Sequence, residues 1–325
     1  MSDLSFAELS PDLILDAIET VGVQVSSGLL ALNSYENRVY QFVAEDNKRY
    51  VVKFYRPQRW TNEQIQEEHD FTLELMRDSV PVVAPLIING ASLHQHANYR
   101  FALFPSIGGR QFEADNLIQL EWMGRFIGQM HKVAKSEKFK HRPEVCTTDY
   151  LDTPKRILLT GSLVPRHLQT TFHHILDQVM RETESRFSKN YQSIRLHGDL
   201  HPGNILCRDG PSFVDLDDCR MGPAVQDIWM MLSGDRQQQV IQLEKIIDAY
   251  SEFNEFDMGQ ILLIEPLRAM RMIHYMAWLT LRWEDPAFPI AFPWFADDKY
   301  WENQIIALKE QFSALQEHPM QLYSK

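Results

Sequence analysis

The sequence is poor in cysteine, in basic residues and in long apolar runs. Its three cysteines, Cys146, Cys207 and Cys219, stand at unrelated spacings in 325 residues, so the pattern fits neither a disulfide framework nor a zinc motif. We therefore expect a reducing, cytoplasmic compartment. No apolar run approaches the roughly 18 residues of a membrane span. Residues 1–13 lack the basic and apolar regions of a secretory signal, so we expect no membrane association.

Basic residues are outnumbered. The chain has 32 Lys and Arg against 44 Asp and Glu, a net charge of −12, which argues against a nucleic-acid partner because phosphate binding depends on basic side chains. A hydrophobic share of 44% and a charged share of 23% are typical of a globular protein with a full core. The length suits two domains or one enzyme with two lobes, and we expect a monomer.

The first third of the chain alternates between strand and helix signals. Ser10 and Pro11 open a short helix at 8–22, because a capping residue is followed by proline in the first turn. Thr61 is a plausible cap for a longer helix at 62–77. Strand-like runs occupy 23–25, 28–32, 38–44, 49–54, 86–89 and 99–104. We expect residues 1–105 to form a small lobe (the N-lobe) with an antiparallel, nucleotide-binding sheet and one helix.

Residues 105–109, with a proline and two glycines, break the strand pattern. The periodic signal that follows is mainly helical, at 115–134, 165–188, 225–232, 236–253 and 258–283. One strand–turn–strand interrupts it, at 204–207 and 213–215. We predict an α+β, bilobal fold in which residues 106–325 form a large helical lobe (the C-lobe) with the catalytic loop, a metal site and a helical substrate region.

The most informative stretch is Leu196-His-Gly-Asp-Leu-His-Pro-Gly-Asn204. It places Asp199 and Asn204 five residues apart on a tight loop. A phosphotransferase needs a carboxylate that orients the attacking hydroxyl and accepts its proton, and an oxygen ligand for magnesium. Kinase catalytic loops use this D-x-x-x-x-N spacing. The pattern predicts Asp199 as the base and Asn204 as a metal ligand; the alternative is a polar turn before a hairpin.

A second acidic group follows at Phe213-Val-Asp-Leu-Asp-Asp218. A strand that ends in carboxylates presents them at its tip, where magnesium can bind with waters and phosphate oxygens. We expect Asp215 to be the main ligand. Strand alternation would place Asp217 on the same face as a candidate ligand of a second ion. Asp218 is expected to cap or to pair with Arg220.

Lys53 stands inside an apolar strand, where a lysine needs a partner or a solvent-facing position. In a kinase it would hold the nucleotide phosphates and pair with a helix glutamate. Glu67 and Glu68 are the candidates, and Glu68 is preferred for its spacing to apolar residues of the same helix. The alternative is a surface lysine on an edge strand. Ser34 precedes it in a loop without glycine, where a hydroxyl and backbone amides could contact phosphate.

Three other features are less specific. Asp227 begins a helix and is interpreted either as a support for the catalytic loop or as a simple N-cap. The pair His94 and His96 is expected in a polar surface loop. Arg268 and Arg271 belong to the polar face of an amphipathic helix, which could line a substrate cleft.

The two motifs, His197-Gly-Asp-x-His-x-x-Asn204 and Val214-Asp-Leu-Asp-Asp218, resemble the aminoglycoside phosphotransferase and choline kinase group. Three further stretches are similar to the bacterial stress response kinase A family, namely Leu32–Tyr40, Val52–Pro57 and Glu265–Arg271. The resemblance to the aminoglycoside phosphotransferase and choline kinase group covers nearly the whole chain. The two resemblances together imply a protein-kinase-like fold and a cytoplasmic serine/threonine protein kinase that uses ATP and Mg²⁺ in stress response.

The resemblance also implies a role for individual residues. These roles are Asp199 and Asp215 as catalytic residues, Asn204 and Asp215 as magnesium ligands, Lys53 with Glu68 as the nucleotide anchor, Ser34 at the ATP site, and Phe104 to Ser106 as the adenine hinge. Only eleven residues separate Asp215 from Asp227, which is too short for a long phosphorylatable activation loop.

Three functions compete at this point. The first is a serine/threonine protein kinase whose substrate is another protein or the chain itself. The second is a small-molecule hydroxyl kinase of the aminoglycoside, choline or homoserine kinase type, because the catalytic loop is shared with such enzymes. The third is a pseudokinase that binds nucleotide without turnover.

Overall fold

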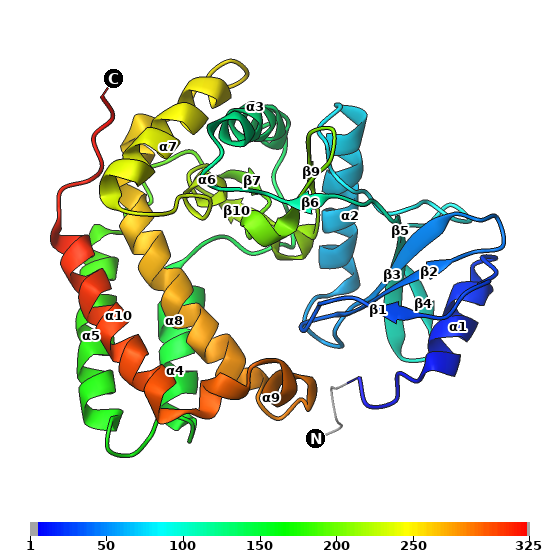
Figure 1. Ribbon diagram of the computed structural model, residues 1–325, viewed down its shortest axis with the longest axis horizontal. Coiled ribbons are helices and arrows are strands. Elements are labelled where there is room, and N and C mark those ends of the chain that lie inside the picture. The colour runs from blue at the N-terminus through cyan, green and yellow to red at the C-terminus, as the bar shows by residue number, and fades with distance from the viewer. Residues whose placement is uncertain (1–5, 324–325) are drawn as a thin grey trace.

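A computed structural model of the chain describes residues 6–323. Figure 1 shows two lobes, with the sheet of the N-lobe on the right and a helical C-lobe on the left. The helices are α1 (Pro11–Thr20), α2 (Asn62–Arg77), α3 (Leu117–Ala134), α4 (Thr153–Thr160), α5 (Gln169–Arg186), α6 (Gln226–Trp229), α7 (Arg236–Tyr250), α8 (Ile264–Arg282), α9 (Ala287–Ala291) and α10 (Asp298–Gln316). The strands are β1 (Leu30–Ala31), β2 (Arg38–Val43), β3 (Arg49–Phe54), β4 (His94–His96), β5 (Tyr99–Pro105), β6 (Arg110–Gln111), β7 (Ile194–Leu196), β8 (Ile205–Cys207), β9 (Pro211–Phe213) and β10 (Arg220–Gly222). The α+β, two-lobed architecture is the one predicted.

The N-lobe is built on a five-stranded sheet in the order β1-β2-β3-β5-β4, with antiparallel neighbours throughout. Its central strand is β3, where Lys53 pairs with Val39 on one side and Ala102 on the other. Apolar residues of the sheet and of α1 form a separate small core. The N-lobe therefore holds two helices, α1 and α2, which match the helices predicted at 8–22 and 62–77. The expectation of a single helix for the lobe as a whole was wrong.

The second half of the N-lobe sheet differs from the sequence prediction. Residues 86–89 form no strand, and only Ile88 makes an isolated bridge, to Ala91. The expected polar loop at His94 and His96 is instead strand β4, which pairs with β5. The ring of His94 packs on Phe101, with centroids 5.5 Å apart, so edge pairing and ring packing stabilise a strand that has little apolar content of its own.

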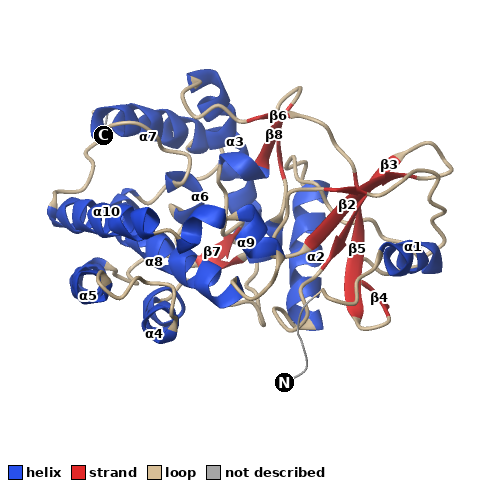
Figure 2. Cartoon of the chain, turned by 60° about the horizontal axis from the view of Figure 1, so that its bottom comes forward, coloured by secondary structure: helices blue, strands red, loops and turns tan. Residues whose placement is uncertain are grey.

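Helix α2 joins the two lobes and lies between the sheet and the C-lobe in both views (Figure 1, Figure 2). Thr61 and Gln64 form a capping box at its start, each side chain bonding the other's backbone amide. Towards its C-terminal end, Phe71 and Leu75 are buried in the large core of the C-lobe. The C-terminal half of α2 is thus fixed in the C-lobe core, while Glu68, nearer its N-terminus, contacts Lys53 of β3.

The C-lobe packs its helices in pairs, α3 on α7, α5 on α10 and α4 on α8. The expected helix at 258–283 is divided into a 3-10 segment, Met258–Leu263, and α8. The boundary fits Pro266, which is tolerated in a first helical turn because amides there have no intrahelical acceptor. Helices α4, α9 and α10 have no counterpart in the sequence prediction.

The chain crosses between the lobes at residues 106–109. Strand β5 ends at Pro105, and the next strand, β6, already pairs with β8 of the C-lobe. The division of the chain into residues 1–105 and 106–325 stays a prediction, because α2 of the first part packs in the large core of the C-lobe. Within residues 6–323 no helix is both long and apolar enough to cross a membrane.

Candidate active site

The loop after β7 is held in place by the buried carboxylate of Asp227. Its two oxygens accept the backbone amides of His197 (2.8 Å) and Gly198 (2.9 Å). The ring of His131 lies 3.1 Å from the first of these oxygens. Asp227 is fully buried, so both oxygens depend on these donors. The structure therefore favours loop support over a simple N-cap.

Gly198 is required by the path of this loop. Its φ is +86°, and a Cβ there would lie 2.2 Å from the carbonyl oxygen of Asp218. A larger residue would have to push the two segments apart. Glycine thus lets the loop that carries Asp199 approach the segment that carries Asp218.

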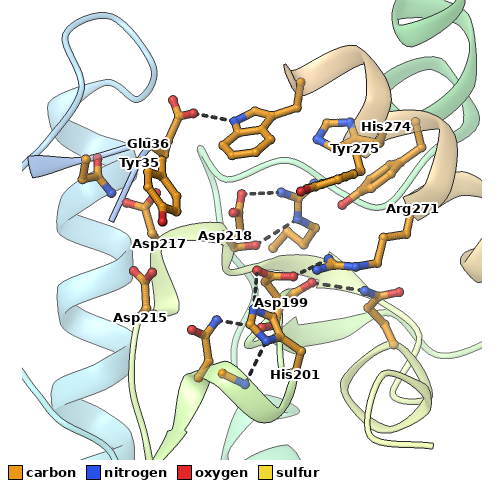
Figure 3. A pocket seen from close by; sticks show the side chains of 18 of the residues that line it. Tyr35, Glu36, Asp199, His201, Asp215, Asp217, Asp218, Arg271, His274 and Tyr275 are labelled. Carbon is orange, nitrogen blue, oxygen red and sulfur yellow. Dashed lines mark hydrogen bonds and ion pairs between the residues drawn. The ribbon is translucent and has the colours of Figure 1, made fainter. Parts of the chain in front are cut away.

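Asp199 faces the cleft with a basic group on each side (Figure 3). Arg271 of α8 donates from Nη1 to Oδ1, and Nε2 of His201 lies 3.5 Å from Oδ2. The amide of Gly203 donates to Nδ1 of His201 at 3.0 Å, so the neutral ring carries its proton on Nε2. Burial would raise the pKa of Asp199, but the hydrogen bond from His201 and the charge of Arg271 outweigh it and lower that pKa. The carboxyl is therefore ionised at neutral pH.

Asn204 and Asp215 are brought together by the β8–β9 hairpin. The amide of Val214 donates to the carbonyl of Asn204 at 3.0 Å, next to Asp215. The side-chain nitrogen of Asn204 donates to the carbonyl of Asp199 at 2.9 Å, so its amide oxygen remains as the acceptor for a cation. Asp215 has a φ of 60°, in the left-handed region, and its side chain is 49% exposed.

Lys53 reaches this group from the N-lobe. Its ammonium lies 2.9 Å from Asp215, 3.2 Å from Asp217 and 3.5 Å from Glu68. Burial would lower its pKa, but the three carboxylates raise it well above the ordinary value. A surface lysine on an edge strand is therefore excluded, because β3 is central and the side chain is only 7% exposed.

Glu68 is the glutamate that pairs with Lys53. Its other oxygen accepts a hydrogen bond from Arg142 at 2.9 Å. Glu67 instead accepts the backbone amides of Lys140 (2.6 Å) and Arg142 (2.9 Å) in the C-lobe. The two neighbouring glutamates thus have separate tasks, one at the lysine and one at the interlobe contact.

The expected strand face shared by Asp215 and Asp217 does not exist. Strand β9 ends at Phe213, and Leu216–Asp218 form a 3-10 turn. Asp217 nevertheless points at Lys53, and its second oxygen bonds Arg59. Burial would raise the pKa of Asp217, but Lys53 and Arg59 lower it to about 2. Asp218 pairs with Arg220 as expected, at 2.9 Å, and also with Arg59.

The oxygen atoms near Lys53 fit a magnesium site. Asp217 Oδ1 is buried, and although it is 3.2 Å from Lys53 it accepts no hydrogen bond of regular geometry. Together with the amide oxygen of Asn204 and the carboxylate of Asp215, it is the kind of hard oxygen ligand that Mg²⁺ takes. No three His, Cys, Asp or Glu side chains among residues 6–323 form a preformed metal cage, so phosphate and water would supply the remaining ligands.

Asp199, Asn204, Asp215 and Asp217 line one cleft of about 470 Å³, and Lys53 and Glu68 lie behind its lining residues. Ser34 lines it from the loop between β1 and β2. Phe104 and Ser106 lie at the end of β5, outside the lining residues, where the amide of Ser106 donates to the carbonyl of Arg49 at 3.1 Å. Their role at an adenine ring stays a prediction.

The sequence analysis assigned no role to three residues of the cleft, Arg59, His201 and Arg271. Arg59 follows β3 in a segment without periodicity, and nothing in the sequence points to its carboxylate partners. His201 was noted only as part of the loop. Arg271 was placed on a helix face that could line the cleft, and the similar stretch Glu265–Arg271 was the signal that could have drawn attention to it.

Known proteins resemble this chain in sequence and in structure. A model of the phosphotransferase enzyme family matches residues 29–263. The chain is 52% identical over 321 residues to stress response kinase A of Escherichia coli K12, covering 99% of this chain and 98% of that protein. It is 51% identical over 318 residues to the serine/threonine protein kinase RdoA of Salmonella typhimurium LT2, with coverage of 98% and 97%.

Two solved structures share the fold at low sequence identity. A microcompartment-associated aminopropanol kinase superposes with a TM-score of 0.71 at 17% identity, over 94% of this chain and 98% of that one. The amicoumacin kinase hAmiN superposes with a TM-score of 0.67 at 20% identity, over 90% and 93%. These neighbours establish the bilobal fold, and their substrates are their own.

Proposed function

Because the chain belongs to the phosphotransferase enzyme family, and within it to the stress response kinase A relatives, we propose that it is a Mg²⁺-dependent serine/threonine protein kinase. That it is an ATP-dependent phosphotransferase follows from the family. We further propose that it acts in stress response, in the cytoplasm and as a monomer.

The observation that carries this proposal is the contact between two groups of residues at one cleft, where Lys53 lies 2.9 Å from the lining residue Asp215. The nucleotide anchor, Lys53 with Glu68, comes from the N-lobe. Asp199 and the oxygen ligands Asn204 and Asp215 come from the C-lobe. Phosphoryl transfer needs a held nucleotide and an oriented acceptor hydroxyl, and each lobe supplies one of the two.

In this mechanism Asp199 accepts a hydrogen bond from the acceptor hydroxyl and takes its proton as transfer proceeds. Lys53, kept in place by Glu68, binds phosphate oxygens of the nucleotide. Asn204 and Asp215 would hold Mg²⁺, which neutralises charge on the phosphates. Asp227 contributes indirectly, because the two hydrogen bonds that it accepts from backbone amides fix the position of the loop that carries Asp199.

A protein acceptor is favoured by the full-length relatives, which are more than half identical and named as kinases. A small-molecule acceptor is the second candidate, because aromatic rings enclose part of the cleft. Tyr35 packs on Phe292 with ring centroids 4.7 Å apart, and Trp278 lies 6.0 Å from the same ring. An enclosed aromatic chamber is the usual form of a small-ligand site.

The test is transfer of labelled γ-phosphate from Mg-ATP to a basic protein, to the chain itself and to a panel of small alcohols. We expect label on serine or threonine of protein with the wild type and at least about 10²-fold slower labelling with Asp199→Asn. Label on a small alcohol alone would replace the protein kinase assignment by the second candidate. Thermal stabilisation by Mg-ATP without transfer to any acceptor would indicate a pseudokinase.

A further inference from the structure

Helix α8 carries one residue that the proposed mechanism leaves unassigned. Arg271 projects from the C-lobe into the cleft and contacts Asp199 from the side opposite Asp215 and Asp217 (Figure 3). Its side chain is 39% exposed. A surface arginine on an amphipathic helix would point to solvent, whereas this one ends on the carboxylate expected to act as the base.

The other arginines of the cleft have different partners. Arg59 bonds Asp217 and Asp218, and Arg220 bonds Asp218. These partners are buried or partly buried carboxylates other than the expected base. Within residues 6–323, the only hydrogen bond of the Arg271 side chain is to Asp199. Its placement is therefore specific to the base.

The contact leaves Asp199 able to work. A carboxylate has about four acceptor positions, and Arg271 occupies one of them on Oδ1 while His201 approaches Oδ2 from 3.5 Å. A charge-assisted hydrogen bond of this kind fixes the plane of the carboxylate more firmly than a neutral one. The remaining lone pairs stay available to an acceptor hydroxyl.

The helix gives the arginine a rigid base. The neighbouring residues Met270 and Ile273 are buried in the large core, and α8 packs on α4, α5 and α10. Side chains that orient a reacting group work best on such fixed elements. Arg271 is thus a donor at a defined height above the loop of Asp199.

We propose that Arg271 is a positioning residue for phosphoryl transfer, which holds the Asp199 carboxylate in the orientation that receives the acceptor hydroxyl. In the reaction the acceptor oxygen bonds the γ-phosphorus, the bond from that phosphorus to the departing ADP oxygen breaks, and the hydroxyl proton passes to Asp199. Arg271 keeps its protons throughout. The inference rests on the proposed function only for the role of Asp199, and it holds for a protein or a small-molecule acceptor.

The test compares Arg271→Ala, Arg271→Gln and Arg271→Lys with the wild type, on whichever acceptor the wild type labels. Because a misplaced reacting group can cost about 10²-fold, we expect kcat to fall by about that factor in Arg271→Ala. The Kd for Mg-ATP should stay unchanged. Arg271→Lys should retain more activity than Arg271→Gln, and added guanidinium should partly restore Arg271→Ala.

The matched control is Arg268→Ala, one turn earlier on the same helix. Arg268 bonds Gln239 and lies 3.6 Å from Glu265, outside the cleft lining, so its loss should leave kcat unchanged. Equal thermal melting of the two alanine variants will show that Arg271→Ala folds normally.

Three results would overturn the inference. They are a wild-type kcat in Arg271→Ala, a kcat above the wild type, which would make the contact a restraint on Asp199, and a loss of Mg-ATP affinity that accounts for the whole defect. A wild type that labels only small alcohols would refute the protein kinase proposal while leaving this comparison intact, so the two failures are distinguishable.

Discussion

Among the ion pairs that join the lobes, two groups differ in whether their partners are expected to change when nucleotide binds. The inner cluster comprises Lys53, Arg59 and Glu68 of the N-lobe with Asp215, Asp217 and Asp218 of the C-lobe. It lies at the bottom of the cleft, where the nucleotide phosphates and magnesium are expected. Its lysine and its carboxylates can therefore change partners when nucleotide binds.

The outer clasp comprises Glu36, Arg38, Arg56, Arg282 and Asp285. Asp285, just after α8, accepts from Arg38 at 3.1 Å and from Arg56 at 2.8 Å. Glu36 accepts from Arg282 at 2.8 Å and from the indole of Trp278 at 2.6 Å, the latter drawn in Figure 3. These contacts tie the loop before β2 to the C-lobe across the cleft from the 106–109 crossing.

We expect the inner cluster to act in catalysis and nucleotide binding, and the outer clasp to act in closure of the cleft. Both groups consist of basic residues and carboxylates, but the inner cluster contains the expected nucleotide anchor and metal ligands, so its loss should change kcat or nucleotide affinity. Residues of the clasp contact mainly one another and nearby aromatic rings or backbone, and Glu36 also lies 3.7 Å from Arg59 of the inner cluster. Their loss should change stability and opening of the cleft, because closure often gates such enzymes. Substitutions can test this division.

The largest effect is expected at Asp199. Asp199→Asn keeps the size of the side chain but removes its ability to take a proton, so kcat should fall by about 10²- to 10⁴-fold. Binding of Mg-ATP, measured by calorimetry, should remain close to wild type because the nucleotide anchor is elsewhere. Substantial activity in this variant would refute the role of Asp199 as the base.

A smaller effect is expected at Glu68. Glu68→Gln removes one charge that holds Lys53, so the Kd for Mg-ATP should rise about tenfold, equivalent to about 1.4 kcal/mol. The matched control is Glu67→Gln, which weakens backbone contacts at 140–142 but leaves Lys53 untouched. Equal losses of nucleotide affinity in both variants would contradict the assignment of Glu68 as the partner.

Asp227→Asn tests the support of the loop rather than its chemistry. An amide at this position places a donor against the backbone amide of His197 or Gly198, so one buried donor loses its acceptor. We expect a loss of about 1–3 kcal/mol in the free energy of unfolding, together with reduced kcat. Urea denaturation measures the first, and unchanged stability would show that the loop is held by other contacts.

Asp285→Ala tests the outer clasp. Because contributions of partly exposed ion pairs are small, the free energy of unfolding should fall by about 1 kcal/mol or less. Hydrogen exchange should increase in the loop at 33–37, while the Kd for Mg-ATP and kcat should stay near wild type. A defect in kcat as large as that of Asp199→Asn would abolish the distinction between the two groups.

The smallest effect concerns pH. Burial would raise the pKa of Glu36, but Arg59 and Arg282 outweigh it and lower that pKa below 4.5. For Asp285, Arg56 outweighs burial and lowers the pKa below 3.8. Carboxyls with lowered pKa values stabilise the fold at a pH above their unfolded values and lose this contribution as pH falls through the folded ones.

The stability difference between wild type and Asp285→Ala should therefore be constant from pH 7 to about pH 5 and should narrow below pH 4. Urea unfolding at several pH values measures it. A difference that widens on acidification would have the wrong sign for a paired carboxylate.

Local patterns predicted the elements whose stability is local. Helix α2 was predicted with its exact bounds, because Thr61 and Gln64 cap it and its apolar spacing is regular. Strands β2 and β3 were predicted from the strand-like runs at 38–44 and 49–54. Strand β4 was missed because its three residues have no apolar alternation of their own and are stabilised by pairing with β5, which follows it directly. Helix α10 was missed because it is stabilised by packing on α5, which is distant in sequence.

The candidate site shows the same division. Asp199, Asn204 and Asp215 could be proposed as site residues because a tight loop and a short hairpin are specified by nearby residues, and their roles stay predictions. The argument for Asp217 from strand alternation was wrong, because the chain leaves the strand at Phe213 and turns through a left-handed Asp215. That Asp217 still faces Lys53 is a result of packing. Its proposed role at a second metal ion stays a prediction.

The sequence by itself determined which chemical groups are available to this protein: a candidate base, candidate oxygen ligands for a metal and a candidate lysine anchor, each in a short segment with its own turn or strand. Only the tertiary structure decided which charges meet. Arg271 reaches Asp199 across 72 residues, and Arg38 reaches Asp285 across 247. Such pairs depend on how α8 packs in the C-lobe core and on how α2 joins the lobes. Their positions follow from burial of apolar surface over the whole chain, which no local spacing records.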